Sequence, residues 1–267
     1  MTKRESNGAA NSGMNRRGFL ARGGALSGTL LLGGCDGLFR NDLVQRILAS
    51  ADSLTEAVQR ALLTPESLAR EYAPEDISAD FKANGSINPD TPDYRKLAEN
   101  DFKDWRLTVG GLVETPLTLS LEDLRGMPAR SQITRHDCVE GWSSIGKWTG
   151  VQLSRVLDQA KLKENAKYIV FYCYDDLGRG DTEASRYYES IALPDAYHPQ
   201  TILAYDMNDE TLPIPHGAPL RVRVERQLGY KMAKYIRSIE AVESYDDIRG
   251  GGGGFWEDRG YAWYAGI

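Results

Sequence analysis

The sequence predicts a mixed α+β fold, a single domain with a helix ahead of it. Strand-type patterns recur from residue 105 onward, and helical patterns follow only some of them. A doubly wound parallel sheet needs a helix after almost every strand, so that architecture is disfavoured. The chain has 267 residues, of which 41% are hydrophobic, and this is enough for one substantial core.

Residues 1–35 have the features of an export signal. Residues 15–20, Asn-Arg-Arg-Gly-Phe-Leu, form a twin-arginine pattern, and an apolar stretch continues to Leu32. This stretch is too short for a comfortable membrane span. Residues 32–35 match a lipobox, so we expect Cys35 to become the lipidated N-terminus of a periplasmic protein anchored at the inner membrane. In the alternative, Cys35 is an ordinary residue near a simple cleavage site.

The export route also bears on what the protein carries. Twin-arginine export suits proteins that cross the membrane already folded, often because a cofactor is inserted in the cytoplasm. An exported protein with a bound cofactor is therefore the first expectation.

Residues 36–75 are predicted to be a helical spacer, and residues 76–267 the main domain. Between residues 40 and 72, apolar side chains recur at three- and four-residue steps, as in a helix. They are Leu43, Val44, Ile47, Leu48, Ala51, Leu54, Val58, Ala61 and Leu62. Residues 74–100 are polar and rich in turn signals such as Asn84-Gly85, so we expect a loop that forms one wall of a site.

A hairpin-like pattern opens the main domain. Trp105, Leu107 and Val109 alternate with polar residues, and two glycines at 110–111 turn the chain toward a second strand at 117–119.

Two short helices and three further strands are predicted after the hairpin. Ser120 followed by Asp123 has the spacing of a helix start, and residues 151–160 form a second helical pattern. Residues 166–174 form a continuous apolar strand that contains Cys173. The last two strand patterns hold Leu220, Val222 and Val224 in alternation with Arg221, Arg223 and Glu225, and then Ile236, Ile239 and Val242.

Net charge limits the choice of partners. The formal net charge is -6, and residues 1–34 contribute +4 because five Lys and Arg residues stand against one Glu. Subtracting that contribution leaves -10 for the rest of the chain. An acidic body disfavours nucleic acid and a basic membrane-binding patch. We therefore expect membrane attachment only through a lipid on Cys35.

Cys138 is the candidate functional residue of the main domain. Three cysteines occur, and neither Cys138 nor Cys173 lies in a Cys-x-x-Cys pattern, which excludes zinc ribbons, thioredoxin-like redox centres and covalent haem. The run at 135–143 is Arg-His-Asp-Cys-Val-Glu-Gly-Trp-Ser. It suits a site that presents one thiolate to a soft metal. A free cysteine packed in a core is the open alternative.

Three ordered motifs resemble the molybdopterin-binding domain of the sulfite oxidase superfamily. They are residues 136–143 with 148–151, residues 212–213 with 216–221, and residues 229–234. The resemblance extends from Phe81 to Tyr264 and is closest to the exported bacterial branch that contains the catalytic subunit of protein-methionine-sulfoxide reductase. It implies a mixed-sheet, sulfite-oxidase-type fold and an oxidoreductase that transfers oxygen atoms.

The resemblance also assigns roles to individual residues. It implies that Cys138 is the thiolate ligand of molybdenum in a molybdenum-molybdopterin cofactor. It further implies that the cofactor is bound by Asn84, Cys173, His216, Arg221, Met232, Ala233 and Lys234. Cys173 is equally well an ordinary residue of a core strand. His136 and Asp137 flank the ligand and have either a pocket-lining or a structural role.

The residues after Cys138 bear on the substrate. Sulfite oxidases have an Asn-Arg-Arg-type run there, whereas this chain has Glu140-Gly141-Trp142. A dianion beside Glu140 is electrostatically unfavourable, so the resemblance favours reduction of a small sulfur-oxo substrate such as a sulfoxide. Sulfite oxidation stays open, because four arginines could restore positive charge: Arg135, Arg179, Arg186 and Arg226. The non-enzymatic alternative is an exported lipoprotein that uses the scaffold as a binding module.

The electrons are expected to come from another protein. The chain has no nucleotide-binding fingerprint, and the bare glycine run at 250–254 is typical of a flexible linker. A membrane cytochrome b or a periplasmic cytochrome c suits the expected location. The tail at 255–264 is unusually aromatic and is expected to cap the core or, alternatively, to bind a partner.

Overall fold

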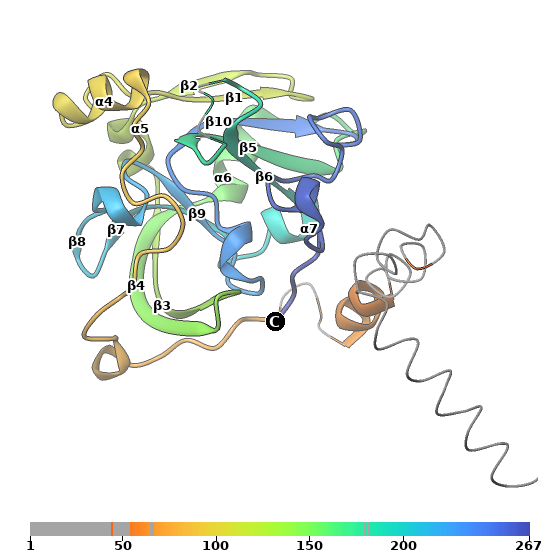
Figure 1. Ribbon diagram of the computed structural model, residues 1–267, viewed down its shortest axis with the longest axis horizontal. Coiled ribbons are helices and arrows are strands. Elements are labelled where there is room, and N and C mark those ends of the chain that lie inside the picture. The colour runs from red at the N-terminus through yellow and green to blue at the C-terminus, as the bar shows by residue number, and fades with distance from the viewer. Residues whose placement is uncertain (1–43, 45–53, 63, 65–66, 179, 181) are drawn as a thin grey trace, which may run out of the picture. The chain divides into compact units, whose positions relative to one another are not determined.

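The computed structural model describes residue 44 and residues 54–62, 64, 67–178, 180 and 182–267 (Figure 1). The chain divides into two compact units, Met1–Leu54 and Thr55–Ile267, and the helices and strands named in Figure 1 belong to the second. The twin-arginine and lipobox predictions lie outside the described residues. Among the residues that are described, no helix has the length and apolar character needed to cross a membrane.

Two five-stranded sheets form the framework of the second unit. The strands of the first are β1 (Leu107–Gly111), β2 (Leu117–Leu119), β5 (Tyr168–Asp176), β6 (Arg186–Ala192) and β10 (Ile236–Val242). Their order is β2-β1-β10-β5-β6, in which β1 and β10 are parallel and the other neighbours are antiparallel.

The second sheet is antiparallel throughout. It contains β3 (Ala129–Cys138), β4 (Trp142–Gln152), β7 (Ile202–Met207), β8 (Glu210–Thr211) and β9 (Arg221–Arg223). The order is β3-β4-β7-β8, with β9 also paired to β7. The helices of this unit include α4 (Pro92–Glu99), α5 (Leu121–Gly126), α6 (Leu153–Ala160) and α7 (Leu193–Ala196).

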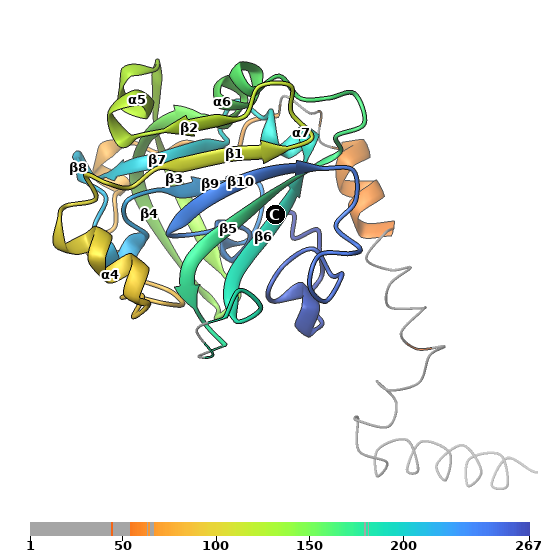
Figure 2. The ribbon, with the colours of Figure 1, turned by 90° about the horizontal axis from the view of Figure 1, so that it is seen from above.

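The hydrophobic core lies between the two sheets, which Figure 2 shows as layers. Leu107 and Phe171 of the first sheet share one buried cluster with Leu203 and Val222 of the second, and α6 adds Val156. Strands and helices thus alternate irregularly around one core. The predicted mixed α+β class is confirmed.

Several local predictions are also confirmed. Trp105, Leu107 and Val109 are buried, and β1 pairs with β2 in the expected hairpin. Ser120 and Asp123 form a capping box at the start of α5. The Asp123 N–H donates to Ser120 Oγ at 3.1 Å, and Asp123 Oδ2 accepts from the Ser120 N–H at 2.8 Å.

Two predictions for the first hundred residues are wrong in part. Of the helix expected over 40–72, residue 44 and residues 54–62 are helical, whereas residues 67–72 are not. Residues 40–43, 45–53, 63 and 65–66 lie outside the described part of the chain. Thr64 precedes a proline in the sequence, and such a residue is biased away from the helical conformation. The loop expected over 74–100 contains α4, which begins with Pro92. Proline is favoured at the first position of a helix, because the N–H that it lacks would have no partner within the helix there.

Strand β3 of the long β3–β4 hairpin has no apolar residue at its buried positions. The buried positions of β3 are Gln132, Thr134 and His136, all of them polar. Apolar periodicity cannot detect a strand whose buried face is polar. The helix predicted at 151–160 begins only at Leu153, because Val151 and Gln152 still belong to β4.

The glycine run at 250–254 is an ordered loop, and the flexible-linker prediction is wrong. The Gly252 N–H donates to Asp258 Oδ1 at 2.8 Å. Gly253 has a φ of +87°, and a Cβ at this position would lie 2.6 Å from the Trp263 ring. The glycines therefore allow the loop to pack tightly, since larger residues would collide with the tail.

The aromatic tail packs on its own domain, as the core-capping prediction expects. Phe255 is buried, and its N–H donates to the Tyr188 carbonyl at 3.0 Å. The Leu228 N–H donates to the Ala265 carbonyl at 2.9 Å. Residues 255–265 thus run along β6 and the segment that follows β9.

Candidate active site

Cys138 ends β3 and lines a pocket. A tight turn follows it, in which the Gly141 N–H donates to the Cys138 carbonyl at 3.0 Å and Gly141 has a φ of +84°. The thiol is half-buried, and burial together with the charge of Glu140 raises its pKa. The chain alone therefore keeps this thiol protonated at neutral pH, so a bound cation is needed to hold it as a thiolate.

Four of the eight predicted site residues meet in this pocket. Asn84, Met232 and Lys234 line it together with Cys138. Asn84 comes from the polar loop before α4, and the other two follow η3 (Gly229–Lys231). The loop thus forms a wall of the site, as its turn-rich sequence predicted.

Lys234 is a buried cation whose hydrogen bonds go to carbonyl oxygens. Its Nζ donates to the carbonyls of Asn84 at 2.6 Å, Ser86 at 2.5 Å and Pro215 at 3.1 Å. Burial and the nearby Arg221 charge lower the pKa of the ammonium to about 7. A negative ligand in the pocket would stabilise the charged form.

Arg221 is the second buried cation, and two of its nitrogens have no partner. The side chain is fully buried, and Nη1 donates to the His216 carbonyl at 2.9 Å. Its Nε and Nη2 make no hydrogen bond, although the guanidinium lies 4.8 Å from the centre of the Trp148 ring. Burial, and then the charge of Arg223, lower the pKa of Arg221 to about 9. Such unmet donors are costly in a folded interior unless a ligand accepts from them.

His216 adds a neutral ring to this region. It packs edge-on against Phe81 with 5.6 Å between ring centres. Burial and the charges of Arg221 and Lys234 lower its pKa to about 4, so the imidazole is uncharged at neutral pH. It can then donate one hydrogen bond and accept another.

The remaining two predicted residues are placed in the core. Cys173 on β5 is fully buried and is not among the residues that line the pocket, and burial raises the pKa of its thiol. Ala233 is also buried, and its carbonyl accepts from the Val222 N–H at 2.9 Å. For Cys173 this placement favours the alternative role as a core strand residue.

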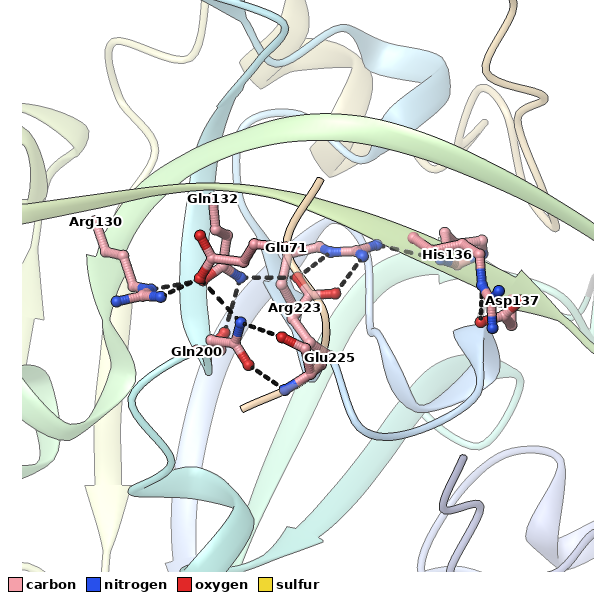
Figure 3. A network of polar contacts seen from close by, with 10 residues as sticks. Glu71, Arg130, Gln132, His136, Asp137, Gln200, Arg223 and Glu225 are labelled. Atoms are coloured by element: carbon pink, nitrogen blue, oxygen red, sulfur yellow. Dashed lines mark hydrogen bonds and ion pairs between the residues drawn. The ribbon is translucent and has the colours of Figure 1, made fainter. Parts of the chain in front are cut away.

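A buried polar network supports β3 just before Cys138 (Figure 3). Gln132 Nε2 donates to Glu225 at 2.8 Å, and Arg223 donates to the same carboxylate at 2.9 and 2.6 Å. Arg223 Nη1 lies 3.1 Å from His136 Nδ1, and the His136 ring packs so closely on Gly229 that a Cβ there would lie 2.3 Å away. His136 therefore has a structural role, holding β3 against η3.

Three of the four arginines that were expected to attract a dianion are paired with carboxylates away from the pocket. Arg135 bonds Asp137 at 2.9 Å, Arg186 bonds Asp93 at 2.7 Å, and Arg226 lies 3.5 Å from Asp195. None of these three lines the Cys138 pocket, and Arg179 lies outside the described residues. The prediction that they restore positive charge is not supported for the three that are described. Asp137, which also accepts from Ser143, serves to fix the strand ends.

Several pocket residues carry no motif signal in the sequence. Asp175 of β5 and Tyr187 of β6 line the pocket, and so do Trp256 and Tyr261 of the tail. They come from three places in the chain, β5, β6 and the tail, which no short pattern connects. The aromatic composition of the tail was the one available signal.

This site fits an anionic, phosphate-bearing cofactor beside a metal-ligating thiolate. Arg221 and Lys234 are buried cations, and no carboxylate ion pair involving either is found among the described residues. The charge of Arg221 lowers the pKa of Lys234, and the charge of Arg223 lowers the pKa of Arg221, so a negative ligand would relieve the repulsion among these cations. Together with the Cys138 thiol in the lining of the pocket, these cations define the class of protein. It is a domain that holds an anionic cofactor next to one cysteine.

Comparison with known proteins identifies the family. Residues 94–248 match the oxidoreductase molybdopterin binding domain. The chain belongs to this family of molybdopterin-binding oxidoreductases, in the sulfite oxidase superfamily. The family binds a molybdenum cofactor, and the binding-module alternative is thereby set aside.

Three similar proteins can be named. The putative protein-methionine-sulfoxide reductase subunit YedZ1 of Azospira oryzae is 37% identical over 251 residues, which cover 94% of this chain and 87% of that protein. The protein-methionine-sulfoxide reductase catalytic subunit MsrP of Campylobacter jejuni is 31% identical over 178 residues, 64% of this chain and 60% of that one. The sulfane dehydrogenase SoxCD of Paracoccus pantotrophus is a solved structure with 26% identity and a TM-score of 0.47, covering 55% of this chain and 41% of its own.

Proposed function

We propose that the protein reduces sulfoxide-type substrates by oxygen-atom transfer, with molybdenum-molybdopterin as cofactor and Cys138 as its protein ligand. The names of the two curated relatives support this activity. When bound, the cofactor supplies the two-electron chemistry of oxygen-atom transfer. Lys234, Arg221 and the neutral His216 hold its negative and polar groups, and Cys138 supplies the thiolate.

The observation that carries the choice of substrate is the charge at the pocket opening. Glu140 lines the pocket beside Cys138, and hydrogen bonds from Trp142 at 2.9 Å and Lys82 at 3.4 Å lower the pKa of its carboxyl. The carboxylate is therefore ionised at neutral pH. The Glu140 carboxylate and the Lys82 ammonium form a pair with no net charge. Such a pair does not attract a dianion and does not repel a neutral sulfoxide.

A pair of assays on metal-replete protein tests this proposal. Methionine sulfoxide with a reduced viologen as electron donor should be turned over. Sulfite with an electron acceptor should not. Turnover of sulfite without turnover of sulfoxide would reverse the assignment in favour of a sulfite dehydrogenase.

Asp175 is placed to supply a proton to this reaction. Reduction of a sulfoxide to a sulfide and water consumes two electrons and two protons. The Asp175 carboxyl lines the pocket, is 3% exposed, and its Oδ1 makes no hydrogen bond. Burial raises its pKa to about 7, and the Lys234 charge only partly opposes this. The charged or titratable groups around it are Cys173, Asp176, Arg186, Tyr187, Lys234, Tyr235 and Tyr94.

Asp175→Asn should therefore change the pH profile. In the native protein kcat should fall as pH rises through about 7, because the proton on the carboxyl is lost. In the Asn variant kcat should no longer fall as pH rises through this range, so this limb of the pH profile should be absent. Below pH 7 its kcat should be about 10²-fold lower than that of the native protein. Asp176→Asn is the control: it removes a neighbouring negative charge, lowers the pKa of Asp175, and should move the limb to lower pH. An unchanged limb in Asp175→Asn would rule out this proton donor.

We further propose that the protein acts in the periplasm, anchored at the inner membrane by a lipid on Cys35, with a membrane cytochrome b or a periplasmic cytochrome c as electron donor. The twin-arginine pattern at 15–20 and the lipobox at 32–35 support this location. Cys35→Ser should move the protein from the membrane fraction to the soluble periplasmic fraction. Detection of the Ser variant still in membranes would contradict a lipid anchor.

A further inference from the structure

We propose that the C-terminal tail provides a substrate subsite, in which Trp256 and Tyr261 bind the methyl-sulfoxide end of a methionine-sulfoxide side chain beside Cys138. The inference rests on the proposed sulfoxide reductase activity and names the residues that recognise the substrate. No sequence motif singles out these two residues. They are identified because they line the same pocket as Cys138.

Aromatic side chains form one wall of the Cys138 pocket. Trp256 and Tyr261 line the same pocket as Cys138, and their rings stack with 5.4 Å between centres and 28° between planes. Tyr230, which also lines the pocket, meets Tyr261 edge-on at 5.3 Å. Tyr261 is 41% exposed, so this wall extends from the interior of the pocket to the surface. A residue on another polypeptide can therefore reach it.

The chemistry of this wall suits a sulfoxide side chain. Aromatic rings make favourable contacts with sulfur and with methyl groups, and their faces attract the positive end of a dipole. A sulfoxide sulfur carries partial positive charge and bears a methyl group. Stacked rings on one side would hold that sulfur with its oxygen directed toward the Cys138 side of the pocket.

A buried ion cluster fixes the tail in place. Lys231 Nζ lies 2.5 Å from Glu189 Oε1 and 2.6 Å from Glu257 Oε1, and all three side chains are at most 1% exposed. Glu257 directly follows Trp256, while Lys231 directly follows Tyr230. The Tyr230 hydroxyl also donates to the Ala262 carbonyl at 2.7 Å. The wall is thus preorganised, and Glu257 is a positioning residue for it.

Substitution of the two rings tests the subsite. With N-acetyl-methionine sulfoxide amide as substrate, Trp256→Leu and Tyr261→Leu should each raise KM about tenfold, with kcat within about threefold of the native value. Tyr197→Leu is the matched control, because Tyr197 is 40% exposed and does not line this pocket. It should leave both constants unchanged.

Binding of the corresponding sulfone, which is not reduced, gives a readout independent of turnover. Calorimetry on cofactor-loaded protein should show affinity about tenfold weaker in both ring variants and unchanged in Tyr197→Leu. Native protein that fails to reduce any sulfoxide would overturn the proposed function. Native turnover with KM and sulfone affinity unchanged in the ring variants would overturn the subsite alone.

Variants of Glu257 test the positioning role without touching the substrate. Glu257→Ala keeps the Lys231–Glu189 pair and should raise KM as the ring variants do, while trypsin cleavage at the exposed Arg259 becomes faster. Glu257→Gln retains an acceptor for Lys231 and should restore most of the native KM. An Ala variant with native KM and native cleavage rate would show that the ion cluster does not position the wall.

Discussion

Replacing Cys138 with serine or alanine should abolish oxygen-atom transfer and leave the fold intact. The thiol is half-buried at the end of β3, so its loss creates little cavity and should change the free energy of unfolding by about 1 kcal/mol or less. The turn that follows it is held by the backbone hydrogen bond from Gly141, which does not need the side chain. The metal, by contrast, would lose its one protein sulfur ligand.

We expect kcat to fall by at least about a thousandfold and the paramagnetic Mo(V) signal of the native enzyme to disappear. The measurements are steady-state turnover, electron paramagnetic resonance and metal analysis on the same preparation. Ser131→Ala, at an exposed position of the same strand, is the control and should retain activity. A Cys138 variant with full turnover would remove the metal-ligand hypothesis.

Replacing Arg221 with methionine should weaken cofactor retention while making the cofactor-free chain at least as stable. Two guanidinium nitrogens of Arg221 have no hydrogen-bond partner, and the side chain is fully buried. An apolar side chain of similar volume removes these two buried donors that lack an acceptor, so the free energy of unfolding should rise by about 1–3 kcal/mol. The cofactor content of purified protein should drop about tenfold, because a planar donor to the pterin is lost.

Arg223→Met is the matched control, and the opposite result is expected. Arg223 forms a fully buried pair with Glu225, so its removal leaves a carboxylate without its partner. Unfolding free energy should fall by about 3–5 kcal/mol. Chemical denaturation of protein from cells that lack the cofactor measures both changes. Equal destabilisation by the two substitutions would show that Arg221 has a structural role and is not kept for a ligand.

Local patterns predicted those elements whose signal lies within a few residues. The β1–β2 hairpin and the Ser120 capping box follow from side chains that are neighbours in sequence. The β3–β4 hairpin could not be predicted in this way. The buried positions of β3 are Gln132, Thr134 and His136. Gln132 and His136 are accommodated because Glu225, Gln200 and Arg223, which are distant in the sequence, satisfy some of their polar groups.

The sequence by itself determined the family, because the family is carried by short runs of neighbouring residues. It also supplied Cys138 as the candidate metal ligand and a set of candidate cofactor-binding residues, of which Asn84, Met232 and Lys234 line the same pocket as Cys138. Only the tertiary structure decided what surrounds Cys138. Asp175, Tyr187 and Trp256 come from β5, β6 and the tail, and the packing of two sheets and one ordered glycine loop brings them to one pocket. Their proximity follows from burial and long-range hydrogen bonding, which no local spacing encodes.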